Sequence, residues 1–204
     1  MAARNRVTPT GEIVAIDQRG TFMGNRGSIH RGVGDIARPW QVRRWITCQL
    51  EYKGWVAPKW EPGRWTPLFF WDEAVALAAG HRPCALCRHP DFTRWVDAWE
   101  KAFGERCKVD PMDRRLHDDR IDGRVQRRHR EPWASLPEGA FAVLADGPVL
   151  VLADQVVPWS TAGYGAVAER PAGGEATLLT PAATVEVLRH GYRPQLHPSL
   201  GDRS

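Results

Sequence analysis

Cys84 and Cys87 form a Cys-x-x-Cys pair, a spacing that lets two thiolates share one metal ion. Gly80 and Pro83 come just before the pair and end the helix that the preceding residues predict. Redox-active pairs of this spacing instead begin a helix, where the helix dipole stabilises thiolates. At the carboxyl end of a helix the dipole disfavours thiolates, and a cation compensates. The position therefore favours a zinc site.

A tetrahedral zinc site needs two further ligands. Residues 42–52 alternate with a period of two, which predicts a strand that directs Cys48 inward. We expect Cys48 to be the third ligand and His30, at the end of a glycine-rich segment, to be the fourth. The alternatives for the fourth position are His81, His89 and Cys107.

The elements around the cysteine pair follow from capping and turn residues. A strand over 64–71 leads to a helix that Asp72 caps and Gly80 ends. Together with 42–52, this strand predicts an antiparallel sheet in the first third of the chain. Residues 19–34 hold five glycines and predict a loop, either a plain hairpin turn or a loop whose backbone approaches a ligand closely. A second helix is expected from Pro90 to Gly104.

The last third predicts a hairpin, because the apolar runs 141–144 and 149–152 flank an Asp146-Gly147 turn. A final helix is expected between a Thr180 cap and Gly191. The fold class is therefore α+β, with small antiparallel sheets, a zinc knuckle and a few short helices. We expect a zinc-binding region over 1–130, and a hairpin with the C-terminal helix over 131–204 packed on it.

Composition indicates a packed globular protein of 204 residues with 43% hydrophobic and 25% charged residues. The net charge of +4 comes mainly from arginine, which prefers planar partners such as phosphate. Arginine and tryptophan alternate around 40–45, and 124–130 is a basic run. These patterns predict nucleic-acid contacts through a set of arginines: Arg26, Arg43, Arg44, Arg127 and Arg128.

No apolar run approaches the roughly 18 residues that span a membrane, and the N-terminus lacks the apolar core of a secretory signal. We therefore expect a cytoplasmic protein without a membrane partner. In that reducing compartment the four cysteines are expected as thiols or metal ligands, not as disulfides.

Residues 68–88 carry a resemblance to a known family. The residues concerned are Phe69-Phe70, Glu73-Ala74, Ala79-Gly80-His81-Arg82-Pro83-Cys84 and Cys87-Arg88. In this order they resemble the second half of the zinc module of the bacterial Ada alkylation-response protein. The same half occurs in Ada-like modules attached to nucleases. The resemblance implies that Cys84 and Cys87 bind zinc and that Arg82 and Arg88 contact the DNA backbone. The chain as a whole resembles a family of bacterial proteins of about this length, which implies no activity.

The first half of that module has no counterpart here. Where it has a Cys-x-x-x-Cys or His-x-x-x-Cys pair, this chain has His30-Arg31-Gly32-Val33-Gly34. The cysteine that accepts a methyl group in Ada is therefore missing, and methyl transfer is not expected.

We expect a zinc-binding protein that contacts nucleic acid through arginine and tryptophan surfaces. One alternative is a metal-dependent hydrolase or nuclease that uses the glycine-rich segment, with Asn25, Arg26 and His30, or holds a second, hard metal at His117-Asp118-Asp119. The other alternative is a structural zinc scaffold for protein partners. The sequence indicates no oligomeric state.

Overall fold

The computed structural model describes residues 2–56, 60–145 and 147–203, and these ranges form an α+β fold. A first sheet has the strand order β10-β6-β3-β9-β1-β2. Its strands are β1 (Arg6–Val7), β2 (Ile13–Val14), β3 (Phe22–Asn25), β6 (Ile46–Cys48), β9 (Leu68–Phe70) and β10 (Arg82–Pro83). The pairs β10–β6 and β1–β9 are parallel, whereas the other pairs are antiparallel. The prediction of antiparallel pairing is wrong for these two pairs.

The predicted strand over 42–52 is shorter than expected and has a different neighbour. Only Ile46–Cys48 joins the sheet, and the chain then turns through a separate hairpin of β7 (Glu51–Tyr52) and β8 (Trp55–Val56). β3 lies between β6 and β9, so the strand of Cys48 is not adjacent to the strand that leads into the knuckle. Thr47 is buried as well as Cys48, because both faces of β6 are covered. The period-two alternation therefore predicted a strand that is longer than the observed one.

The glycine-rich segment is half strand and half hairpin. Its first part is β3, and the rest includes β4 (His30–Gly32) paired with β5 (Asp35–Ile36). A Cβ atom on Gly24 would lie 2.0 Å from the carbonyl oxygen of Ile46. The close backbone approach that Gly24 permits is therefore to the neighbouring strand, and the predicted loop is in part the strand β3.

The second sheet has the strand order β13-β19-β14-β15-β16-β17, with β18 on β16, and its pairs are antiparallel. Its strands are β13 (His129–Pro132), β14 (Phe141–Leu144), β15 (Gly147–Val151), β16 (Gln155–Ser160), β17 (Gly163–Tyr164), β18 (Ala168–Glu169) and β19 (Glu175–Leu178). The predicted hairpin is confirmed as β14 and β15, while its turn residue Asp146 lies outside the described residues. A two-stranded hairpin of β11 (Ile121–Asp122) and β12 (Val125–Gln126) precedes this sheet.

Four α-helices occur within the described ranges: α1 (Glu73–Ala78), α2 (His89–Phe103), α3 (Val109–Arg120) and α4 (Ala182–Arg189). Short 3₁₀ turns cover Trp133–Ser135 and Pro198–Arg203. The predicted Asp72 cap is confirmed, since the Val75 N–H donates to its carboxylate at 2.9 Å. The predicted Thr180 cap is wrong: its hydroxyl accepts from the Phe141 N–H, and Asp119 of α3 accepts from the Ala183 N–H at the start of α4.

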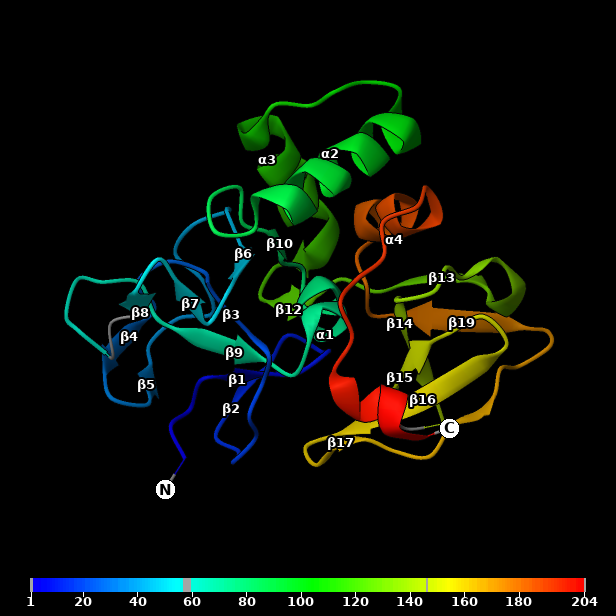
Figure 1. The fold of residues 1–204 in the computed structure, drawn as a ribbon, viewed down its shortest axis with the longest axis horizontal. Helices are drawn as coiled ribbons and strands as arrows, with labels where there is room; N and C mark the ends of the chain where they lie inside the picture. The colour runs from blue at the N-terminus through cyan, green and yellow to red at the C-terminus, as the bar shows by residue number, and fades with distance from the viewer. Residues whose placement is uncertain (1, 57–59, 146, 204) are drawn as a thin grey trace.

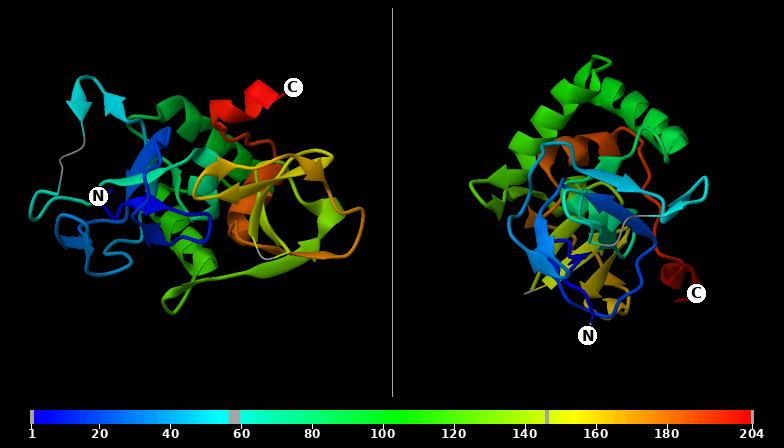
Figure 2. Two further views of the ribbon diagram at one scale, coloured as in Figure 1. Left: turned by 90° about the horizontal axis from the view of Figure 1, so that it is seen from below. Right: turned by 90° about the vertical axis from the view of Figure 1, so that its left-hand side faces the viewer.

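Helix α1 lies between the two sheets, while α2 and α3 lie over them (Figure 1; Figure 2, right). All six residues of α1 are buried. Leu77 belongs to a hydrophobic cluster with α2, α3, α4 and the second sheet, whereas Ala74 and Val75 belong to a cluster with the first sheet. A helix that is apolar on every side is the expected central element of such a core. The predicted boundary at 130/131 falls within β13, and both clusters contain residues from each side of it.

The strand contact at Gly24 gives a stability prediction. Gly24→Ala should lower the free energy of unfolding by about 3 kcal/mol or more, because the methyl group overlaps the β6 backbone. Gly32→Ala is the matched control, since nothing lies within 4 Å of its Cβ position. Urea denaturation of both variants measures the difference, and equal stability of the two would contradict the assigned β3–β6 pairing.

Candidate metal centre

The segment between α1 and α2 carries two cysteines of a three-cysteine cluster. α1 ends at Ala78 and is capped by Ala79, and Gly80 follows with a φ of 84° in the left-handed region. The N–H groups of Gly80 and His81 donate to the carbonyls of Leu77 and Ala76, both at 2.9 Å. These bonds satisfy the open carbonyls at the end of α1 and turn the chain into β10.

β10 then runs beside β6 in parallel. The Arg82 N–H donates to the Trp45 carbonyl at 3.2 Å, and the Cys84 N–H donates to the Thr47 carbonyl at 2.9 Å. This short ladder places Cys84 next to Cys48 at the carboxyl end of β6. The expectation that Cys48 lies near the knuckle is therefore met through β10, and not through β9.

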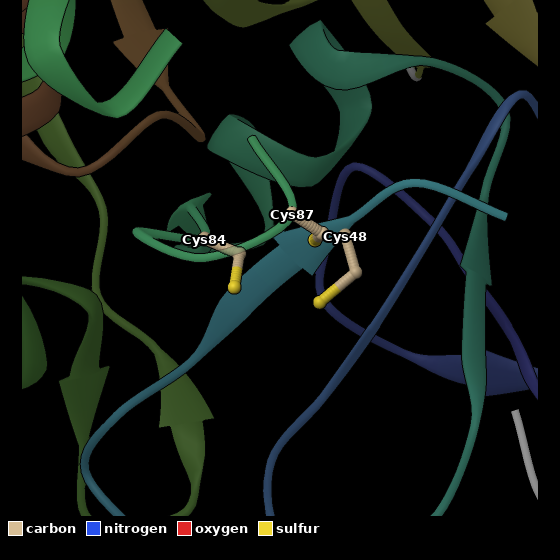
Figure 3. Close-up of side chains that lie close together, drawn as sticks. All are labelled: Cys48, Cys84 and Cys87. Atoms are coloured by element: carbon tan, nitrogen blue, oxygen red, sulfur yellow. The ribbon is translucent and has the colours of Figure 1, made fainter. Parts of the chain in front are cut away.

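The sulfur atoms of Cys48, Cys84 and Cys87 all lie within 4.8 Å of one another. Figure 3 shows Cys48 on β6 facing the turn that carries Cys84 and Cys87. In a tetrahedral site with Zn–S distances of about 2.3 Å, sulfur atoms lie about 3.8 Å apart. A small contraction of the cluster thus suffices to hold one metal ion.

Hydrogen bonds within the cluster favour a thiolate at Cys84. The Cys48 and Cys87 thiols donate to its sulfur and lower the pKa of Cys84 to about 2. The Leu86 N–H also points to this sulfur, at 3.4 Å. The pKa of Cys48 is raised, first by its bond to Cys84, because only one of the adjacent thiols can ionise readily. A divalent cation would relieve this competition by allowing all three to bind as thiolates.

Arg82 and Arg88 flank the cluster in the interior. Arg82 makes a bidentate pair with Asp113, at 2.8 and 2.9 Å. Arg88 lies 2.8 Å from Glu73 and 2.7 Å from Asp91. Each of the two arginines is about 1% exposed. The expectation that they contact a DNA backbone is therefore corrected: both bind carboxylates of the protein and are covered by it.

His30, the expected fourth ligand, does not join the cluster. Its Nδ1 lies 2.6 Å from the Thr66 hydroxyl, and its ring packs edge-on against Trp60. Among the residues that the structure describes, the metal-capable group contains only the three cysteines. His30 instead links the β4–β5 hairpin to the segment before β9.

The alternative fourth ligands also lie outside the group of three. His81 is buried and its Nε2 accepts from the Arg26 side chain at 3.3 Å. Cys107 is partly buried and packs against the hydrophobic cluster of α2 and α3. His89 is exposed in the first turn of α2, two residues beyond Cys87.

The His117-Asp118-Asp119 run does not converge on a metal position. Asp119 caps α4. His117 packs against Trp40 and Trp45, and burial followed by the charge of Arg120 lowers its pKa to about 4. Within the described ranges this run forms no metal-capable group. Among the described residues, this run therefore does not supply the second, hard metal that the hydrolase alternative expects there.

The remaining predicted nucleic-acid residues differ in exposure. Arg26 is 2% exposed and stacks on Trp45, with its guanidinium carbon 4.0 Å from the ring centroid. Arg43, Arg44, Arg127 and Arg128 are exposed. Arg44 pairs with Asp110 at 2.9 Å, and Arg127 lies 4.0 Å from Asp122.

Four further arginines were missed by the sequence analysis. They are Arg4, Arg38, Arg120 and Arg124. Together with Arg26 and Arg128 they line one cavity next to Trp45. They come from separate segments, so no local spacing announces them. The only local signal was Arg124, which belongs to the basic run noted at 124–130.

Comparison of the chain with protein-family models, curated proteins and solved structures finds no match. Within the described residues, no helix is both long and apolar enough to cross a bilayer. The function is therefore inferred from the geometry and chemistry of the residues themselves.

The two arginines that contact Asp91 give a test of the corrected role of Arg88. Arg88→Ala should destabilise the fold by about 3–5 kcal/mol, because it leaves Glu73 buried without a cation and removes the buried partner of Asp91. Arg94→Ala removes a half-exposed partner of the same Asp91 and should cost at most about 1 kcal/mol. Chemical denaturation distinguishes them, and a fully stable Arg88→Ala protein would refute the interior role.

Proposed function

We propose that the chain binds one zinc ion through the thiolates of Cys48, Cys84 and Cys87. The observation that carries this proposal is the approach of three sulfur atoms, from two segments far apart in the sequence, to within 4.8 Å. Thiolate ligands select zinc among the common divalent ions. The fourth position is left to a nitrogen or oxygen donor, either water or His89, which lies two residues beyond Cys87 in the sequence.

The role of the ion in this proposal is to fasten β6 to the turn between α1 and α2. Structural zinc sites contribute directly to folding free energy, since the unfolded chain has no formed site. The resemblance of residues 68–88 to an Ada-like module agrees with such a role for Cys84 and Cys87.

We further propose that the protein contacts nucleic acid through exposed arginines outside the cysteine cluster. Arg43 is exposed and makes no ion pair with any described residue, and Arg127 has only a distant partner at 4.0 Å. Arginine side chains that lack carboxylates on the protein are available for phosphate oxygens. The net charge of +4 has the sign that such contacts need.

The zinc proposal predicts one equivalent of zinc in protein purified without added metal. Cys48→Ser should lower zinc affinity by more than about 100-fold, beyond the 10–100-fold effect of outer partners. Elemental analysis and competition with a chromophoric chelator measure both quantities. Thermal denaturation before and after chelation reports the contribution of the ion to stability.

Cys107→Ser and His30→Ala are the controls, because neither side chain belongs to the cluster. Both should keep one zinc ion. Loss of zinc in His30→Ala together with its retention in Cys48→Ser would contradict the proposed ligand set.

The nucleic-acid proposal predicts a salt-dependent affinity for DNA. The double variant Arg43→Gln/Arg127→Gln should reduce the slope of log K against log[salt] by about 1.8 on duplex DNA, at about 0.9 per phosphate contact. The matched control is Arg31→Gln/Arg106→Gln, whose exposed guanidiniums lie 2.9–3.0 Å from carboxylates. Fluorescence anisotropy over a salt series measures the slopes, and equal slopes in the two variants would contradict the assigned surface.

A further inference from the structure

A cavity of about 680 Å³ lies at the other end of β6 from the cysteines, next to Trp45. The side chains that line it include six arginines: Arg4, Arg26, Arg38, Arg120, Arg124 and Arg128. Glu12, which is exposed, is the one acidic residue among the described residues of the lining. The lining also includes Trp40, which is half-buried. The cavity wall therefore carries a strong excess of positive charge.

None of these six arginines forms an ion pair with a described residue. Four of the six are exposed, whereas Arg26 and Arg120 are as deeply buried as Arg82 and Arg88, which bind carboxylates instead. The buried arginines of this molecule are thus of two kinds, and those without an ion pair to a described residue lie at one cavity.

Arg26 is the first of two buried members. It is 2% exposed, its Nη1 donates to the Gly11 carbonyl at 3.1 Å, and its Nε donates to His81 at 3.3 Å. Its Nη2 makes no hydrogen bond within the described part of the chain. Burial lowers the pKa of Arg26 to about 9, which still leaves it charged at neutral pH.

Arg120 is the second buried member, at 1% exposure. Its guanidinium also stacks on Trp45, at 4.0 Å, and it donates to the carbonyls of Gly80 and Arg43. Burial and then the nearby charge of Arg26 lower the pKa of Arg120. The fold makes room for it, because a Cβ atom on Gly80 would lie 2.4 Å from the Arg120 Cδ.

Two adjacent buried cations without a carboxylate are costly unless an anion accompanies them. Backbone carbonyls, a histidine, an indole face and the more distant carboxylates of Asp113 and Asp118 supply only part of the needed compensation. Guanidinium groups present forked donors that match phosphate oxygens, and arginine is the only cationic residue type among the described residues of this lining.

We propose that this cavity binds the phosphate groups of a nucleotide, either free or at the 5′ end of a nucleic-acid strand. The volume lies within the roughly 300–1,000 Å³ of small-ligand sites. Trp40 offers an aromatic face on which a base can stack. The strand-end form of the inference rests on the proposed nucleic-acid contact, whereas the phosphate chemistry does not.

The test uses the full-length protein and isothermal titration calorimetry with pyrophosphate and ATP. The variant Arg124→Gln/Arg128→Gln removes two exposed charges from the cavity wall and should weaken both ligands at least tenfold. The matched variant Arg31→Gln/Arg106→Gln removes two exposed charges outside the lining and should change affinity less than twofold. Arg26→Gln should abolish binding while its thermal midpoint stays at or above that of the wild type, because a buried unpaired cation is removed.

The source of the phosphate is resolved with two short single-stranded oligonucleotides that differ only in a 5′-phosphate or 5′-hydroxyl group. A tenfold preference for the 5′-phosphate that disappears in Arg124→Gln/Arg128→Gln supports the strand end as ligand. Cavity-dependent binding of ATP without that preference supports the free nucleotide, even if the nucleic-acid contact fails. Absence of pyrophosphate and ATP binding, or equal weakening by the two double variants, overturns the inference.

Discussion

The parallel pairing of β6 with β10 is the interaction on which both candidate sites depend. Two backbone hydrogen bonds, from Arg82 to Trp45 and from Cys84 to Thr47, join strands that are three and two residues long. Each such bond contributes only about 0.5–1.5 kcal/mol net, so the ladder cannot hold itself. A metal ion across Cys48, Cys84 and Cys87 would close its carboxyl end, while Trp45 and its stacked arginines occupy the other end. A disturbance of the ladder should therefore reach both sites.

The buried arginines show how one residue type serves two purposes in this fold. Arg82 and Arg88 bind carboxylates on α1, α2 and α3, so they join the helices to the first sheet. Arg26 and Arg120 have no such partner among the described residues and face a cavity. A buried charge is costly without an opposite charge nearby. Carboxylates of the protein compensate the charges of Arg82 and Arg88, whereas the charges of Arg26 and Arg120 are the basis of the proposed phosphate site.

Local signals in the sequence predicted local structure well. The Asp72 cap, the left-handed Gly80 and Gly104, and the β14–β15 hairpin all depend on residues close together in the chain. Long-range placement failed, because nothing in the alternation of 42–52 shows that β3 separates β6 from β9. The sequence predicted both Cys48 and His30 beside Cys84 and Cys87, but in the structure only Cys48 lies there. Proximity in sequence to a strand does not fix the direction of a loop. The unpaired state of Arg26 and Arg120 depends on their three-dimensional distances from the described carboxylates, which a sequence cannot reveal.

The central claim is that three thiolates of this chain bind a single zinc ion whose fourth ligand is not a cysteine. Zinc K-edge X-ray absorption of the purified protein measures this coordination directly. The proposed coordination predicts three sulfur scatterers at about 2.3 Å and one nitrogen or oxygen scatterer at about 2.0–2.1 Å. A shell of four sulfur atoms, or one dominated by nitrogen and oxygen, would contradict the cluster of Cys48, Cys84 and Cys87 as the zinc site.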